Sequence, residues 1–191
     1  NDAWHLQNTG QLTGAVDNID LDAIEFWDAL PDTPEVVIGV IDSGIEKTHL
    51  DLQGLLWVNP GETADDGIDN DGNGYIDDIF GWDFVNDDND PADDTGHGTK
   101  VTGVIAANIN NSTGVAGLLT NPTVVVCKVF NDEGLSSSSD VMQAMSYLKD
   151  HGVSIVNYSG GGGDYNQSYY ERIEELSEAD VLLTFPAGNT A

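Results

Sequence analysis

Asp42 and His97, which are far apart in the chain, have the side chains of a general acid–base pair. Asp42 ends an apolar, β-branched run and precedes a serine and a glycine. His97 lies between two glycines, and apolar residues with helical spacing follow it. An aspartate beside a histidine orients the imidazole and stabilises its protonated form, so the pair can activate a hydroxyl nucleophile. Taken singly, each residue also has an ordinary structural explanation, as the cap of a turn or of a helix.

The segments around these residues alternate between strand-like and helix-like patterns. Continuous apolar runs predict strands at 35–42, 123–130, 153–158 and 180–186. Periodic apolar positions predict helices at 20–30, from His97 onward, at 138–150 and at 167–179. The alternation predicts an α/β fold of three layers, a mainly parallel central sheet with helices on both faces. The stretch 48–94 is loop-rich and needs something to order it.

This architecture predicts that a third polar residue, Asn189, lies near the pair. Ligands of open parallel sheets bind at the carboxyl edge of the strands. Asp42 ends a strand at that edge, His97 begins a helix there, and Asn189 follows the strand at 180–186. An asparagine amide can donate a hydrogen bond to an oxyanion, which is worth about 3–4 kcal/mol in the transition state. A turn asparagine is the ordinary alternative, but the convergence of all three residues favours a reaction site.

The composition excludes several classes of partner. The chain has 191 residues and carries 34 Asp and Glu against 5 Lys and Arg, a net charge of −29. Such a surface disfavours nucleic acid and anionic membranes. The single cysteine, Cys127, excludes an internal disulfide and lies in an apolar run, which predicts a buried thiol. No run of 18 apolar residues is present, so membrane insertion is not expected, and if the chain is exported its signal peptide has been removed.

The acidic segment at about 60–94 contains a pattern typical of calcium loops. Oxygen-bearing side chains occupy positions 1, 3, 5 and 9 of the pattern, with glycine at position 6. The candidate ligands are Asp69, Asp71, Asn73, the carbonyl of Tyr75, Asp77 and Asp78. Position 12 is Phe80 instead of glutamate, so the pattern is not a complete EF-hand. A solvated acidic loop is the alternative, but clustered carboxylates repel one another unless a cation lies among them.

Four motifs, in order, resemble those of the subtilisin-like serine proteases. Val-Ile-Gly-Val-Ile-Asp-Ser-Gly-Ile at 37–45 resembles the aspartate motif of that family, and Gly-His-Gly-Thr at 96–99 resembles its histidine motif. Ile-Val-Asn-Tyr-Ser-Gly-Gly at 155–161 resembles the strand that lines the substrate cleft. Ala-Gly-Asn at 187–189 resembles the oxyanion-hole motif. The order Asp, His, Ser is the family's own.

The resemblance implies a role for each matched residue. It implies Asp42 as the orienting acid, His97 as the general base, Asn189 as the oxyanion donor, and Ser159, Gly160 and Gly161 as binders of the substrate backbone. The implied partner is a protein or peptide substrate, and the implied location is extracellular. The segments around Asp51 and from Asn111 onward also resemble family segments that build a calcium site with an N-terminal glutamine. This resemblance implies a second and weaker Ca²⁺ site at Gln7, Asp51 and Asn111. Asn111 also begins an Asn-Ser-Thr glycosylation motif, which would compete with a metal role.

The chain departs from the family's pattern in two ways. Lys100 and Thr102 replace a histidine and a small residue in the histidine motif. The family's serine motif, Gly-Thr-Ser-Met-Ala, does not occur before Ala191. We therefore expect residues 1–191 to be a partial subtilisin-like peptidase domain, incomplete at its C-terminus and inactive alone. The serine would come from a C-terminal part of the same protease. The alternative is a non-catalytic, calcium-binding domain with a structural or adhesive role in an extracellular assembly.

Overall fold

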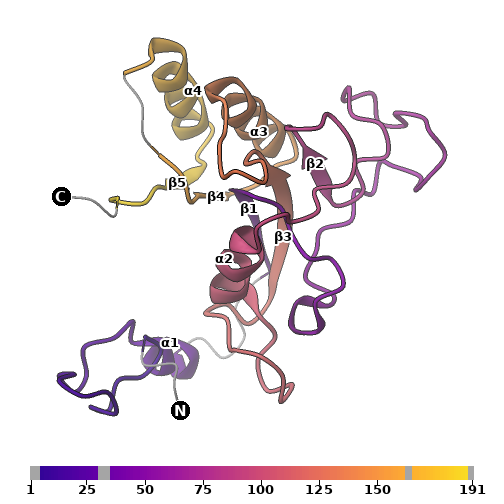
Figure 1. The fold of residues 1–191 in the computed structure, drawn as a ribbon. Helices are drawn as coiled ribbons and strands as arrows, with labels where there is room; N and C mark the ends of the chain where they lie inside the picture. The colour runs from indigo at the N-terminus through magenta and orange to yellow at the C-terminus, as the bar shows by residue number, and fades with distance from the viewer. Residues whose placement is uncertain (1–4, 30–34, 162–164, 189–191) are drawn as a thin grey trace.

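The computed structural model describes residues 5–29, 35–161 and 165–188. In these ranges a five-stranded, all-parallel sheet forms the centre of the molecule, with the strand order β2-β3-β1-β4-β5 (Figure 1). The strands are β1 (Val36–Asp42), β2 (Gly81–Asp83), β3 (Pro122–Lys128), β4 (Ile155–Tyr158) and β5 (Leu182–Thr184). The helices are α1 (Ala23–Ala29), the 3-10 helix η1 (Leu50–Leu52), α2 (His97–Ala106), α3 (Ser138–Asp150) and α4 (Gln167–Glu178).

Helices cover both faces of the sheet, so the predicted three-layer α/β fold is confirmed. Neighbouring residues of a strand point to opposite faces. On β3, Val125 and Cys127 therefore join a buried cluster under α3 and α4, whereas Val124 and Val126 join the cluster under α2. Figure 1 shows α3 and α4 on one side of the strands and α2 on the other. The two inner strands β1 and β3 are mainly apolar because both of their faces are buried.

The predicted boundaries of most elements agree with the structure to within a few residues. Helix α3 matches the predicted range in full, and Ser137 caps it by accepting a hydrogen bond from the Asp140 amide. Helix α1 begins three residues later than predicted, because Asp22 has a φ of 52°, in the left-handed region. Residue 30, the predicted end of that helix, lies outside the described residues.

The acidic segment contains a strand that the sequence analysis did not predict. Strand β2 spans three residues and pairs in parallel with the end of β3. All three β2 residues are buried, and Gly81 lies so close to β3 that a Cβ atom there would meet the Val126 carbonyl oxygen at 1.8 Å. The segment 60–94 is therefore divided: an acidic loop, residues 60–80, precedes β2, and the remainder leads to α2. Within the described ranges, no helix combines the length and the apolar character that crossing a membrane requires.

Candidate active site

The structure brings Asp42 and His97 together at the carboxyl edge of the sheet. Asp42 is the last residue of β1 and is fully buried, while His97 is the first residue of α2 and its side chain is 58% exposed. His97 Nδ1 lies 2.7 Å from Asp42 Oδ1. Because an ionised carboxylate only accepts hydrogen bonds, Nδ1 carries the proton and Nε2 is left with a free lone pair. This arrangement is that of an oriented general base.

The backbone around the pair permits an unusually close approach of α2 to β1. An ideal Cβ atom at Gly98 would lie 2.2 Å from the Gly44 carbonyl oxygen, so a side chain cannot be accommodated there without a shift of backbone. Gly96, the N-cap residue of α2, has a φ of 75°, which glycine adopts without strain. The glycines on both sides of His97 are therefore required by the geometry that joins the imidazole to Asp42.

The predicted substrate-binding residues lie beside this pair. Ser159 lines a cavity of about 350 Å³ together with Asp42 and His97. Gly160 and Gly161 line a larger cavity of about 730 Å³. Phe130 and Gly134 line both cavities, so the two spaces are neighbours along one cleft. An extended peptide lying along residues 159–161 would reach from the larger cavity to the imidazole. The predicted oxyanion donor, Asn189, lies outside the described residues.

Six of the fifteen residues that line the larger cavity are aromatic. Its wall includes Phe130 and Tyr158, whose rings are stacked with their centroids 6.0 Å apart, and Tyr169. Burial raises the pKa of Tyr158 above its usual value and raises that of Tyr169 to about 12. Both phenols are therefore neutral at physiological pH, and this part of the cleft suits an apolar group.

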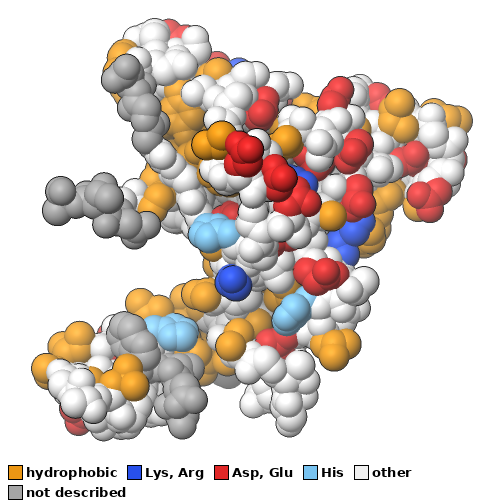
Figure 2. Space-filling model, viewed as in Figure 1, with side chains coloured by type: hydrophobic (Ala, Val, Ile, Leu, Met, Phe, Trp, Pro, Cys, Tyr) orange, Lys and Arg blue, Asp and Glu red, His pale blue; other side chains and the backbone are white. Residues whose placement is uncertain are grey.

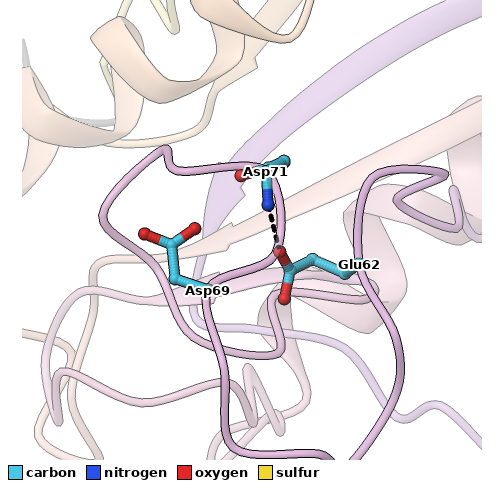
Figure 3. Close-up of side chains that lie close together, drawn as sticks. All are labelled: Glu62, Asp69 and Asp71. Atoms are coloured by element: carbon cyan, nitrogen blue, oxygen red, sulfur yellow. Dashed lines mark hydrogen bonds between the residues drawn. The ribbon is translucent and has the colours of Figure 1, made fainter.

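Two of the predicted calcium ligands, Asp69 and Asp71, gather with a third carboxylate that the sequence analysis missed. Oxygens of Glu62, Asp69 and Asp71 lie within 4.8 Å of one another (Figure 3). Glu62 accepts hydrogen bonds from the amides of Asn70, at 2.7 Å, and Asp71, at 3.1 Å. It lies seven residues before Asp69, outside the alternating pattern, and only its place in the same acidic run could have indicated it.

The other side-chain candidates in the acidic loop are engaged in different contacts. Asp77 accepts hydrogen bonds from the amides of Asp66 and Gly67, at 3.1 and 3.0 Å. The Oδ1 atom of Asn73 accepts the Tyr75 amide at 2.7 Å. Asn73 also contacts the carboxylate cluster, because its Nδ2 donates to Asp71 Oδ2 at 3.3 Å. Three carboxylates thus gather, while Asp77 and Asn73 also bind backbone amides of the loop. The predicted set of calcium ligands stays a prediction.

Asp78 and Tyr75 connect the acidic loop to the rest of the molecule. Asp78 is fully buried and accepts hydrogen bonds from the Tyr147 hydroxyl at 2.6 Å and from the Asn59 amide at 2.8 Å. Burial raises the pKa of Asp78, and these hydrogen bonds partly oppose the rise. The Tyr75 ring makes an edge-on contact with Tyr147, and their centroids are 5.1 Å apart. Both side chains thus anchor the loop to α3.

The second predicted calcium site is only partly assembled. Asp51 is buried, and its carboxylate accepts hydrogen bonds from the Asn111 amide at 2.7 Å and the Val115 backbone at 2.8 Å. Gln7 is exposed, and its carbonyl accepts a hydrogen bond from Gln11 in the N-terminal segment. The structure therefore pairs Asp51 with Asn111, whereas Gln7 accepts its hydrogen bond from within the N-terminal segment.

A parallel sheet with an Asp–His pair at its carboxyl edge places the chain in the α/β class, with the geometry that an oriented general base needs. The family can be stated as well: a sequence model of the Subtilase family matches residues 33–191, and the chain belongs to that family. The predicted membership of the subtilisin-like family is thereby confirmed.

Relatives with established names agree with this assignment. The chain is 39% identical over 153 residues to Subtilisin-like protease 1 of Plasmodium berghei, an alignment that covers 80% of this chain and 26% of the relative. It is 33% identical over 163 residues to Thermophilic serine proteinase of Bacillus sp. strain AK1, covering 85% and 35%. The chain thus spans about a quarter of the Plasmodium protein's length.

A solved structure supports the fold. The crystal structure of a cold adapted subtilisin-like serine proteinase superposes with a TM-score of 0.60 and 24% sequence identity. The superposition covers 81% of this chain and 46% of the other.

Proposed function

We propose that this chain supplies the Asp–His part of a subtilisin-like serine endopeptidase. The observation that carries the proposal is the 2.7 Å contact between His97 Nδ1 and the buried carboxylate of Asp42. His97 also lines the cavity that Ser159 lines, and Nε2 takes no part in the contact with Asp42. The nucleophile is a serine that follows residue 191 in the whole protein. The substrate is a protein or peptide that binds in an extended form along Ser159, Gly160 and Gly161. An extracellular location fits these roles.

The residues act in a fixed order during peptide-bond hydrolysis. His97 Nε2 takes the proton of the serine hydroxyl as the oxygen attacks the peptide carbonyl carbon. Asp42 stabilises the imidazolium that forms. Asn189 and the serine's own backbone N–H donate hydrogen bonds to the oxyanion. His97 then gives its proton to the departing amine, and water hydrolyses the acyl-enzyme by the same route.

Labelling with a fluorophosphonate tests this proposal in the whole protein. The full-length protein should label at a serine beyond residue 191, and His97→Ala should reduce the rate of labelling by a factor on the order of 10⁶. His5→Ala changes a histidine of the N-terminal segment and should leave labelling unchanged. Residues 1–191 alone should not label. If they do, and His97→Ala abolishes the signal, the assignment of the nucleophile beyond residue 191 is wrong.

We also propose that the acidic loop holds calcium, with Glu62, Asp69 and Asp71 as its carboxylate ligands. The donors are all oxygens, which a hard cation such as Ca²⁺ prefers, and a positive charge among them would relieve their mutual repulsion. When bound, the ion would supply that charge and order the loop.

Thermal unfolding with and without calcium tests the metal site. Calcium at about 100 times its dissociation constant should stabilise the protein by about 2.7 kcal/mol. The gain should be much reduced in Glu62→Gln, which removes one charge from the cluster. It should persist in Asp90→Asn, which removes a charge outside the acidic loop. An unchanged melting temperature on chelation would refute the site.

A non-catalytic, calcium-binding role is the second candidate function. The departures of Lys100 and Thr102 from the family's histidine motif favour it, because both residues lie in the helix that carries His97. Hydrolysis of casein by the full-length protein, lost in His97→Ala, would exclude this role. Absence of any labelling together with calcium-dependent stability would support it.

A further inference from the structure

Helix α2, which carries His97, lacks a capping side chain of its own. The first N–H groups of a helix have no partner within the helix and need acceptors from elsewhere. The N-cap residue here is Gly96, so no side chain is available at the usual position. Three residues outside the helix replace it. The His97 amide donates to the Thr95 hydroxyl at 3.2 Å. The Gly98 amide donates to the Ser43 hydroxyl at 2.9 Å, and the Thr99 amide donates to Asp93 Oδ2 at 2.8 Å.

Asp93 is the centre of this arrangement. Its carboxylate accepts five hydrogen bonds, which come from the Ser43 hydroxyl at 2.8 Å, the amides of Thr95, Gly96 and Thr99 at 3.1, 2.8 and 2.8 Å, and the Thr99 hydroxyl at 2.6 Å. These bonds fill both oxygens and outweigh the cost of partial burial, so the pKa of Asp93 is lowered. A negative charge at this end of α2 also favours the helix dipole.

Ser43 continues the connection from Asp93 to the reacting pair. Its hydroxyl donates to Asp93, and its backbone amide donates to Asp42 Oδ1 at 2.7 Å, the same oxygen that faces His97. The residue after Asp42 and the residue after His97 are thus joined through one hydroxyl. The other oxygen of Asp42 has no hydrogen-bond partner among the described residues, so this one oxygen carries the orientation of the carboxylate.

The sheet holds Asp93 in place through its neighbour, Asp94. The Lys128 ammonium group lies 2.6 Å from Asp94 Oδ2 and 3.2 Å from the buried Asp83. Lys128 is itself 2% exposed, and in the parallel pairing of β1 with β3 it lies in register with Asp42. The segment that precedes His97 is therefore fixed to the same edge of the sheet as the catalytic carboxylate.

We propose that Asp93 is a positioning residue for the reaction. It caps α2, holds Ser43, and through these two contacts sets the imidazole of His97 against Asp42. The proposal rests on the proposed function for its kinetic consequence, but its geometric consequence can be measured without activity. A negative side chain with five acceptor bonds cannot be replaced by an apolar one without freeing Ser43 and the first turn of α2.

The kinetic test uses the full-length protein with active-site titration, so that only correctly folded molecules are counted. Asp93→Ala should lower kcat by about 100-fold, the effect of misplacing a catalytic group by about 1 Å, with KM changed less than twofold. Asp93→Asn keeps the size of the side chain and one acceptor oxygen, so its kcat should fall less than that of Asp93→Ala. Ser43→Ala should also lose less, and Ser43→Thr, which restores the hydroxyl, should recover most of the loss. Asp90→Asn is the matched control, because it removes an exposed charge from the same segment.

A spectroscopic test is independent of catalysis. In ¹⁵N-labelled protein, the proton on His97 Nδ1 should give a downfield resonance that is retained in Asp90→Asn and shifted or broadened in Asp93→Ala. An unchanged resonance and unchanged kcat in Asp93→Ala would overturn the proposal. If Asp93→Ala does not fold, Asp93→Asn and Ser43→Ala decide by the same two readouts. If the wild-type protein lacks activity, the proposed function fails, while the resonance still decides the role of Asp93.

Discussion

The Asp–His corner, residues 42–44 with 93–99, and the acidic loop both use aspartates as acceptors of hydrogen bonds, but over different spans of chain. In both regions carboxylates accept hydrogen bonds from backbone amides. In the corner, the bonds that join its two segments link residues 50 to 55 positions apart, such as Ser43 with Asp93 and Asp42 with His97. In the acidic loop, Asp69 binds amides only three to five positions away.

This difference shows what holds each region in shape. The corner is fixed because a strand end and a helix start cannot move independently once Ser43, Asp93 and Lys128 join them. Local hydrogen bonds order the loop's own turns but do not place the loop against the molecule. That placement comes from the buried contact of Asp78 with Tyr147. Figure 2 shows acidic side chains spread over the loop and over the surface next to it, with few basic side chains among them.

The largest effect should follow from breaking the buried ion pair of the corner. Lys128→Met leaves the fully buried Asp83 without its positive partner, and we expect a loss of about 3–5 kcal/mol in the free energy of unfolding, measured with denaturant. The melting temperature should fall in step. A loss below about 1 kcal/mol would show that the corner does not depend on this pair.

The pH dependence of that effect has a defined sign. Burial alone would lower the pKa of Lys128, but its hydrogen bonds to Asp94 and Asp83 outweigh this and raise it. A lysine whose pKa is raised on folding contributes stability that is present below its unfolded pKa of about 10.4. The contribution is lost only as the pH rises through the higher folded value. The difference between wild type and Lys128→Met should therefore persist from neutral pH to about pH 10.

A smaller effect should follow from detaching the acidic loop from α3. Tyr147→Phe removes one hydrogen bond from the ionised and buried Asp78, which should cost about 1–3 kcal/mol. Because burial raises the pKa of Asp78, and the bond favours its ionised form, the loss should be complete at high pH and should shrink as Asp78 becomes protonated. Tyr165→Phe, at an exposed position, should change stability by less than about 0.5 kcal/mol. Equal losses in both variants would contradict the anchoring role.

The smallest effect should follow from breaking an ion pair on the surface between the two regions. Lys47 and Asp90 lie 2.7 Å apart with side chains 34% and 59% exposed. Water screens such a pair, so Asp90→Asn should cost no more than about 1 kcal/mol, and the cost should fall in high salt. A loss of stability as large as that of Lys128→Met would contradict the expectation that the exposed Lys47–Asp90 pair contributes less than the buried Lys128–Asp83 pair.

Much of the fold followed from local patterns. The apolar run before Asp42 and the periodic positions of α3 predicted their elements correctly, because burial on two faces or on one leaves a regular trace in sequence. Strand β2 was missed because three residues are too short for a period, and it exists only through its pairing with β3. Glu62 and the corner role of Asp93 were missed for a related reason: their partners are defined by folding.

The sequence by itself determined the order of the elements, the α/β class and the identity of Asp42 and His97 as a pair, since residue type and periodicity are local properties. Only the tertiary structure decided which aspartates serve which purpose. Asp78 anchors a loop, Asp93 caps a helix and Asp69 joins a cluster of carboxylates, although all three are the same residue type in one acidic run. A carboxylate's role depends on the donors that surround it, and those donors are brought together by the sheet and the helices packed on it.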